Sequence, residues 1–323
     1  MFVVLLEAAF LLIPVFLFGS TGETLTEKSG HLNLGTPGNI CMGAVGGMIG
    51  IACYNSMCGG VVNSNAFLTF VFVLFFALLL GAFSGLLFSF FTVSLRCNQN
   101  VMGLAYTTFG IGCYGLTAQA VNKGDGMLNQ YCLKIAHLFY APADAPNDFC
   151  ALFLSHGLLW YMAIIIAIVV AIVLKRTRVG LFVRTVGENA ASADAAGINV
   201  SKYRYLTTII GCAISALGGL YYFVEINNGI IEFNNIDAYG WLAVALVIFT
   251  LWKTDLGILG AFLFAFLFKL PEIYPLPSTH LNMLFTYLPY FVTVVILVVI
   301  SIVNKKAVQA PGNLGIPYFR EER

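Results

Sequence analysis

Charged residues are scarce in this sequence. Only 10% of the 323 residues are Asp, Glu, Lys or Arg, whereas 59% are hydrophobic and the mean hydropathy is +0.89. Soluble domains carry roughly 25% charged residues. The composition therefore excludes an ordinary soluble domain and predicts an integral membrane protein with several spans. A net charge of +1 and the absence of any nucleic-acid-binding motif give no reason to expect a nucleic-acid partner.

The motifs of several enzyme classes are also missing. No Lys follows a Gly, which excludes a Walker A loop, and neither GxSxG nor HExxH occurs. The four histidines are far apart in the sequence, and no pair of cysteines has CxxC spacing. We therefore expect no enzymatic activity, no metal and no cofactor of its own. If the chain moves a solute actively, another chain must supply the energy.

Long apolar runs divide the whole chain, residues 1–323, into membrane segments of one domain. Strand-like alternation is absent, so we expect an all-α polytopic protein rather than a barrel. The first run has no basic residue ahead of it and is interpreted as a retained span, not a signal peptide. The runs 239–252 and 256–270 are short for two full crossings. They form either two tilted spans or a hairpin buried among other helices. The nine predicted segments, within a range of eight to ten, are 2–19, 39–56, 66–92, 101–119, 155–174, 205–225, 239–252, 256–270 and 286–303.

The distribution of basic residues predicts the orientation. If the loop 175–204 is cytoplasmic, alternation of nine spans places 13 of the 16 Lys and Arg on that side, and only Lys123, Lys134 and Lys269 on the other. The N-terminus is then outside and the C-terminus inside. The external loop 120–154 holds Cys132 and Cys150, which form either a disulfide or two free thiols.

Two polar stretches adjoin spans on the inner side. Residues 20–39 form either a re-entrant element beside a solute path or a plain inner loop. Residues 94–103 read SLRCNQNVMG. Neutral amides in these stretches suit an uncharged polar solute, or else cap helices. The candidate path residues are Asn33, Asn98, Gln99 and Asn100.

Ionisable residues within the predicted spans are few. Glu7 and Glu225 are the main examples, and both lie near segment ends. An ion-coupled carrier usually buries ionisable groups near the midplane of the membrane. A secondary carrier or channel for a small neutral solute therefore remains the alternative hypothesis, without this supporting feature.

The segment 175–204 is the most polar part of the chain and lies between two apolar runs. Within it, Gly187 and Gly197 bracket residues 190–196, which are nearly all good helix formers. One interpretation is a short helix, started by Gly187 and Glu188, that contacts a soluble partner. The other is an ordinary basic cytoplasmic loop.

Three motifs together resemble one family. VGENAASADAAGINVSKYR resembles the cytoplasmic coupling segment of bacterial ABC importer permeases for branched-chain amino acids, simple sugars and nucleosides. GETLTEKSGHLNLGTPGNICMGA resembles the N-terminal signature of that class, and LRCNQNVMGLAYTTFG resembles its Asn-Gln segment. The nucleoside type is the most similar. Two positions depart from the pattern: Pro37 replaces the acid of Glu-Gly, and Ala190 replaces a common proline.

The resemblance implies a permease subunit that imports a small polar solute, most consistent with nucleosides, by alternating access across the bacterial inner membrane. Its expected partners are a second, non-identical permease of which this chain is the shorter, cytoplasmic ATPases that bind ATP and Mg, and an extracytoplasmic solute-binding lipoprotein. Simple sugars and branched-chain amino acids are alternative solutes. The ATPase-coupling residues implied by the resemblance are Gly187, Glu188, Asn189, Ala190, Ala193, Asp194, Ala196 and Gly197.

Overall fold

The chain folds into a bundle of helices in the computed structural model, which describes residues 2–121, 126–136, 138, 153, 156–231, 236–275, 278–303 and 310–319. No strand occurs among these residues. The helices are α1 (Phe2–Glu27), α2 (Thr36–Cys58), α3 (Ala66–Ser89), α4 (Gln99–Val121), α5 (Met127–Ala136), α7 (Leu158–Arg176), α8 (Arg178–Glu188), α9 (Ala190–Ala195), α10 (Val200–Tyr221), α11 (Ile236–Phe249), α12 (Thr254–Ile273), α13 (Thr279–Thr286) and α14 (Leu288–Val303). A short 3₁₀ turn, η1 (Val61–Asn63), follows α2, and single π turns, η2 (Phe90–Ser94) and η3 (Tyr222–Ile226), extend α3 and α10.

Helices form most of each of the nine predicted apolar segments, although residues 156–157 and 250–252 lie beyond helix ends. Within the described part of the chain, six helices are long and apolar enough to cross a membrane: α1, α2, α3 with η2, α7, α10 with η3, and α12. Helix α11 has 14 residues, about 21 Å at 1.5 Å per residue, against a hydrocarbon core of about 30 Å. The neighbouring α12 has 20 residues and is long enough on its own.

The first helix does not end at residue 19, where the sequence predicted the end of the first span. Helix α1 continues through Ser20–Glu27, all of it buried, and α2 begins at Thr36. The polar stretch 20–39 is therefore two helix ends joined by a buried connection, residues 28–35. The reason is tertiary: the polar side chains of this stretch find partners inside the bundle, for example Ser29 with Thr207, whose hydroxyl oxygens are 2.9 Å apart.

The centre of the bundle is formed by α1, α2, α3 and α10, with α4 packed on α2, and α7 and α12 packed on α1. Small residues let these backbones approach closely, as is common in membrane helices. A Cβ built on Gly219 of α10 would lie 1.7 Å from the carbonyl oxygen of Ile40 in α2, and one on Gly46 would lie 2.5 Å from the Cα of Ala77 in α3. Dense helix packing therefore accounts for these glycines.

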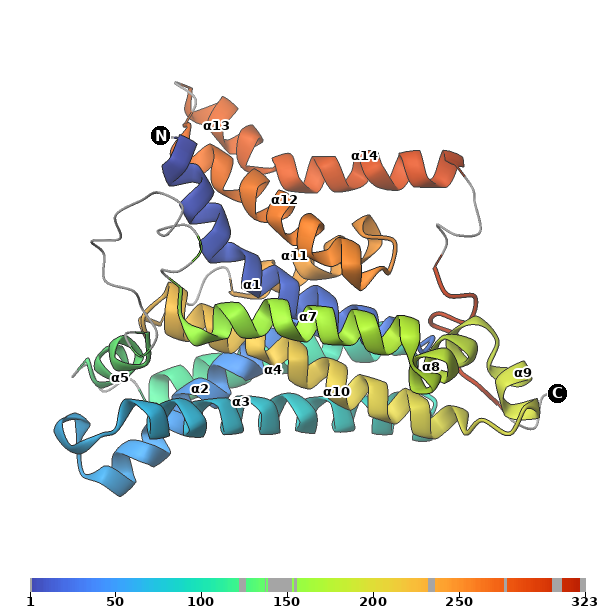
Figure 1. Cartoon of the computed structure of the whole chain (residues 1–323), viewed down its shortest axis with the longest axis horizontal. Helices are drawn as coiled ribbons and strands as arrows, with labels where there is room; N and C mark the ends of the chain where they lie inside the picture. Colours follow the sequence, from blue (N-terminus) through green and yellow to red (C-terminus); the bar gives the residue numbers. More distant parts are fainter. Residues whose placement is uncertain are drawn as a thin grey trace.

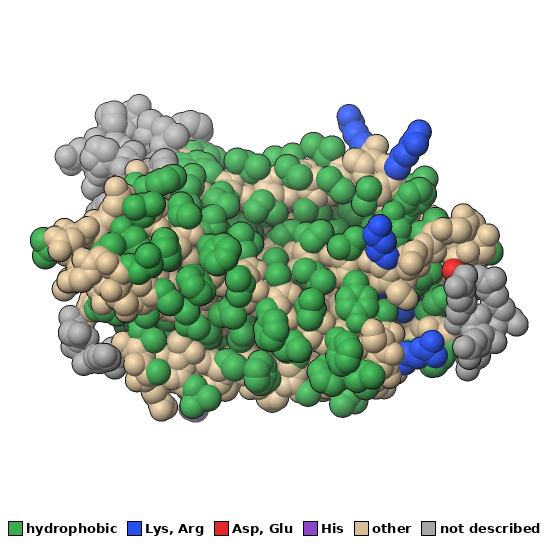
Figure 2. Space-filling view, turned by 90° about the horizontal axis from the view of Figure 1, so that it is seen from below, with side chains coloured by type: hydrophobic (Ala, Val, Ile, Leu, Met, Phe, Trp, Pro, Cys, Tyr) green, Lys and Arg blue, Asp and Glu red, His purple; other side chains and the backbone are tan. Residues whose placement is uncertain are grey.

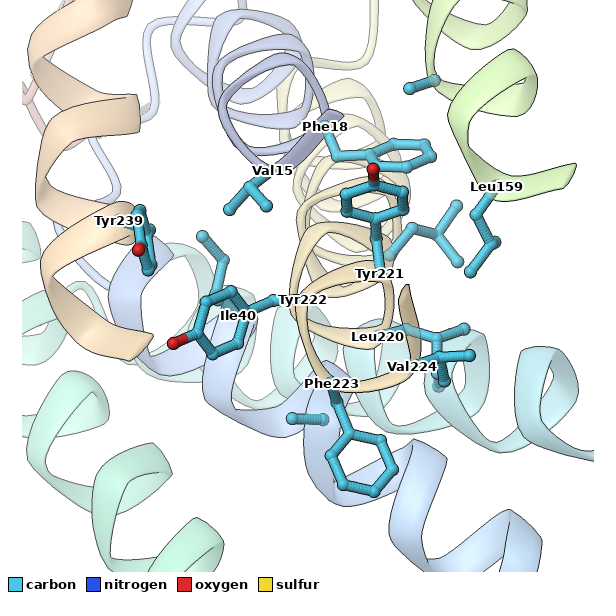
Figure 3. Packing of buried hydrophobic residues seen from close by; sticks show 14 of the residues in the cluster. Val15, Phe18, Ile40, Leu159, Leu220, Tyr221, Tyr222, Phe223, Val224 and Tyr239 are labelled. Carbon is cyan, nitrogen blue, oxygen red and sulfur yellow. The ribbon is translucent and has the colours of Figure 1, made fainter. Parts of the chain in front are cut away.

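Aromatic side chains fill the core where α10 passes into η3. Figure 3 shows Tyr221, Tyr222 and Phe223 directed to different sides of this segment, with Tyr221 close to Phe18 of α1. The Tyr221 hydroxyl donates to the Leu11 carbonyl at 2.7 Å. Consecutive aromatic residues of this segment therefore contact several helices.

The two ends of the bundle differ. The N-terminus lies at one end, and α8, α9 and the C-terminal residues lie at the other (Figure 1). The face in Figure 2 is mostly hydrophobic along its length, with Lys and Arg gathered near the end that carries α8 and α9. Residues 310–319 and the 175–204 segment therefore lie at the same end of the bundle. Cys150, Lys123, Lys305, Lys306, Arg320 and Arg323 lie outside the described residues.

Candidate functional site

Within the segment 175–204, two short helices, α8 and α9, lie between α7 and α10 and meet at Asn189. Helix α8 ends at Glu188, and Asn189 is extended, with φ −153° and ψ 99°. Its side-chain oxygen accepts from the Ser192 N–H at 2.9 Å, which makes Asn189 the N-cap of α9. The expected start at Gly187 and Glu188 is therefore wrong, because those residues complete α8 and an Asn side chain can satisfy the free N–H groups of the new helix.

Helix α9 has only six residues and is held by packing on its inner side. Ala190 and Ala193 are fully buried against Val186 of α8 and Val200 of α10. An isolated helix of this length is not stable in water, so these contacts, with the Asn189 cap, maintain it. Gly197 follows with φ +84°, a left-handed value that ends the helix.

The outer side of α9 is open. The exposed residues of this surface, which we call the α9 face, are Glu188, Asn189, Ala191, Ser192, Ala195, Ala196 and Gly197. Of the predicted coupling residues, the structure thus exposes Glu188, Asn189, Ala196 and Gly197 and buries Gly187, Ala190 and Ala193. Asp194 is half-buried.

Gly187 is buried because another part of the chain lies against it. A Cβ on Gly187 would lie 2.2 Å from the carbonyl oxygen of Lys28, in the connection between α1 and α2. This contact places the end of α8, just before α9, directly on the connection that follows α1. Burial lowers the pKa of Lys28, in part offset by the negative charge of Glu188.

His31 lies in the same connection and is completely buried. Its Nε2 is 2.7 Å from the Thr92 hydroxyl, and its Nδ1 is 2.7 Å from the Thr208 hydroxyl. Because the Thr92 hydroxyl donates to the Phe88 carbonyl, it accepts from Nε2–H, and Nδ1 accepts from Thr208. Burial, together with the nearby charge of Arg204, lowers the pKa of His31 to about 3. The imidazole is therefore neutral and joins η2 to α10.

The predicted path residues fall into two groups. Asn33 and Gln99 are buried: the Gly35 N–H donates to Asn33 Oδ1 at 2.9 Å, and the Leu32 N–H donates to Gln99 Oε1 at 2.8 Å. Asn98 and Asn100 are exposed. The Asn98 side chain accepts from the Asn100 and Val101 N–H groups at the start of α4.

A buried polar cluster that the sequence did not indicate lies beside Asn33. Asn33 and Asn39 both donate to the Cys212 sulfur, at 3.6 and 3.2 Å, and the Ser84 hydroxyl donates to Asn39 at 2.9 Å. The residues come from the α1–α2 connection and from α2, α3 and α10. Asn39 and Ser84 lie inside predicted apolar spans, so only the fold reveals that they meet.

Two buried acids were also missed. Glu23 accepts from the Thr36 hydroxyl, and Glu27 accepts from the indole N–H of Trp252. Both acids are on α1 and at most 3% exposed. Both acids fall in the polar stretch outside the first predicted span, 2–19, and no local signal shows that α1 continues through them.

Comparisons with known proteins extend over almost the whole chain. The family of branched-chain amino acid transport system permease components matches residues 5–302. The nucleoside ABC transporter permease protein NupC of Lactococcus lactis is 27% identical over 325 residues, covering 95% of this chain and 93% of that protein. The guanosine ABC transporter permease protein NupQ of Bacillus subtilis is 26% identical over 313 residues, covering 94% and 92%.

A further relative is named for a sugar. The putative glucose ABC transporter permease protein TsgC13 of Haloferax volcanii is 29% identical over 266 residues, covering 81% of this chain and 75% of that protein. No solved structure matches the chain.

Proposed function

The chain belongs to the family of branched-chain amino acid transport system permease components, and we propose that it is the membrane subunit of an ATP-driven importer for nucleosides. Nucleosides are chosen as the solute because the chain matches two permeases over nearly its full length, one named for nucleosides and one for guanosine. Glucose is the second candidate, because one relative is named for that sugar.

In this proposal the α9 face is the contact for a cytoplasmic ATPase, which binds ATP and Mg. The face is small and uncharged apart from Glu188, and it stands at the end of the bundle where Lys and Arg gather. Binding and release of ATP by the partner would move α9. Such a movement shifts the permease between two states only if the partner binds them with different affinity.

The site supports this coupling role through its rigidity. Helix α9 is capped by Asn189, packed on Val186 and Val200, and joined to α1 through the contact of Gly187 with Lys28. A displacement of α9 therefore acts on helices of the bundle centre. The proposed topology has the N-terminus outside, the C-terminus in the cytoplasm and nine membrane segments in the inner membrane.

The solute path is proposed to pass beside the inner ends of α2 and α4, with Asn33, Asn98, Gln99 and Asn100 near it. Neutral amides beside the path suit a neutral solute that a separate extracytoplasmic binding protein has already selected. A second permease, non-identical and longer, completes the proposed membrane unit.

The test of the solute is uptake in a strain that lacks the transporter genes and is complemented with this chain and its partners. Labelled guanosine, adenosine, glucose and leucine are supplied separately. We expect accumulation of the nucleosides and its loss when ATP is depleted. Accumulation of glucose or leucine alone would reject nucleosides as the solute. Uptake that survives ATP depletion and needs no partner would favour a secondary carrier or channel.

A further inference from the structure

The C-terminal residues Ala310–Phe319, which we call the C-terminal strap, cross the end of the bundle beside α9. They follow α14 and lie beyond residues 5–302, the part of the chain that the family matches. The strap is thus outside the region from which the coupling role of α9 was proposed.

The first half of the strap forms hydrogen bonds with the end of α8 and with the α1–α2 connection. The Asn313 N–H donates to the Gly187 carbonyl at 2.8 Å, and the Gly315 N–H donates to the Gly30 carbonyl at 3.2 Å. Gly315 has φ +78°, a left-handed value, and lies in the turn in which the Ile316 N–H donates to the Asn313 carbonyl. Three separated parts of the chain therefore meet here: the strap, the end of α8, and the α1–α2 connection.

The second half bonds to α9 itself and to its neighbours. The Tyr318 hydroxyl donates to Asp194 Oδ2 at 2.9 Å, and the Tyr318 ring packs on the small cluster that holds α9. The centroid of the Phe319 ring lies 4.8 Å from the guanidinium carbon of Arg96. Arg96 is in the connection between η2 and α4. The strap thus touches α9 on one side and the central helices on the other.

Arg204 ties the strap to α10. Its side chain is only 3% exposed, and its Nη1 donates to the Ile316 carbonyl at 3.1 Å. Within the described residues, no carboxylate forms an ion pair with it, and its Nε and Nη2 have no hydrogen-bond partner. A buried guanidinium needs polar partners, so the strap carbonyl is important for keeping Arg204 in place.

We propose that the C-terminal strap transmits movement of α9 to α1 and α10. Tyr318 and Asn313 hold α9 and the end of α8, while Gly315 and Ile316 hold the α1–α2 connection and Arg204. Helices α1 and α10 pack with their backbones in contact at Gly22 and Gly211. A displacement of one of these helices therefore displaces the other. This inference rests on the proposed contact of α9 with an ATPase.

The experiment compares three variants in proteoliposomes that contain the complete transporter. The first replaces residues 310–319 with a Gly-Ser linker of equal length, and the second is Tyr318→Phe, which keeps the ring and removes one hydrogen bond. The control is Tyr161→Phe, whose hydroxyl donates to the Phe153 carbonyl at 2.8 Å, near the opposite end of the bundle. Solute accumulated per ATP hydrolysed is measured for each, with hydrogen exchange of residues 187–199.

We expect the linker variant to assemble and hydrolyse ATP but to accumulate about fivefold less solute per ATP, because it loses several hydrogen bonds. We expect Tyr318→Phe, which loses one hydrogen bond, to accumulate about twofold less solute per ATP. Exchange at 187–199 rises in both, and Tyr161→Phe matches the unmodified protein. An unchanged ratio in Tyr318→Phe with faster exchange would show a structural contact without transmission and would overturn the proposal. Unchanged exchange in the linker variant would also overturn it.

Failure of the proposed function and failure of the strap to transmit movement give different results. If the unmodified complex accumulates no tested solute on ATP, the proposed function fails. Hydrogen exchange on this chain alone still decides whether the strap holds residues 187–199. If the linker variant does not assemble, the solute-per-ATP ratio of Tyr318→Phe decides the outcome.

Discussion

Gly22 of α1 and Gly211 of α10 face each other so closely that a Cβ added to Gly22 would lie 2.2 Å from the Gly211 carbonyl oxygen. The same Cβ would lie 2.3 Å from the Ser215 hydroxyl oxygen. These distances are well below van der Waals contact, so no side chain fits between the two helices at this point. The pair fixes the distance between the two helices that the strap and α9 act upon.

We expect Gly22→Ala to destabilise the fold by about 1–3 kcal/mol, the usual cost of overpacking a tight core. The matched control is Gly115→Ala on α4, where an added Cβ meets nothing within 4 Å. The midpoint of thermal unfolding in detergent, followed by tryptophan fluorescence, measures both. Equal midpoints for the two variants would contradict the proposed close contact of α1 and α10.

His31 predicts a pH dependence of stability. Its pKa in the folded protein is about 3, below the ordinary value of about 6.5. The unfolded chain therefore takes up the proton more readily, and stability falls as the pH drops below about 6.5, by about 1.4 kcal/mol for each pH unit down to about 3. Above pH 6.5 the group has no effect on the slope.

The His31→Gln variant tests this dependence. Between pH 7.5 and pH 5.0 it should lose about 2 kcal/mol less stability than the unmodified chain, although its stability at pH 7.5 is lower because the bonds to Thr92 and Thr208 are altered. His280→Gln is the control, since His280 is exposed, and it should retain the full slope. Chemical unfolding at the two pH values measures the difference. Identical slopes for all three proteins would mean that His31 is not buried as described.

The two sides of α9 should respond differently to a charge. Ala195→Glu adds a carboxylate to the exposed α9 face, and we expect uptake to fall about tenfold, the effect of weakening a contact by about 1.4 kcal/mol, with an unchanged unfolding midpoint. Ala193→Glu places the charge in the buried contact with Val186 and Val200, and should lower both uptake and the midpoint. Ala195→Ser is the mild control for the exposed position. Normal uptake in Ala195→Glu would remove α9 as the ATPase contact.

The proposed path can be separated from helix capping at the start of α4. Asn98→Ser keeps a side-chain oxygen for the cap, whereas Asn98→Leu removes it at a cost of about 1 kcal/mol. Asn100→Leu changes an exposed amide whose backbone N–H, not its side chain, joins the cap. We expect Asn100→Leu and Asn98→Ser to lower uptake while the unfolding midpoint stays within about 0.5 kcal/mol of the original. Reduced stability in Asn98→Leu alone, with normal uptake in the other two, would assign these amides to the fold.

The fold class and the family could be inferred from the sequence alone. Apolar runs of span length leave the backbone no partner but itself, so helices follow directly, and helices of the structure form most of each predicted run. Composition also excluded a soluble domain, and the three motifs pointed to the permease family. These properties depend on local composition and short motifs, which a sequence displays without knowledge of its neighbours.

The length of α1 and the residues packed beneath α9 depend instead on tertiary contacts. Ser20–Glu27 is polar, and it is helical because Thr36, Trp252 and the backbone of α10 surround it. His31 bonds to Thr208, 177 positions further along the chain, and Tyr318 bonds to Asp194, 124 positions before it. Partners at that separation leave no periodic pattern in a single sequence, because the free energy that fixes them comes from burial between distant segments.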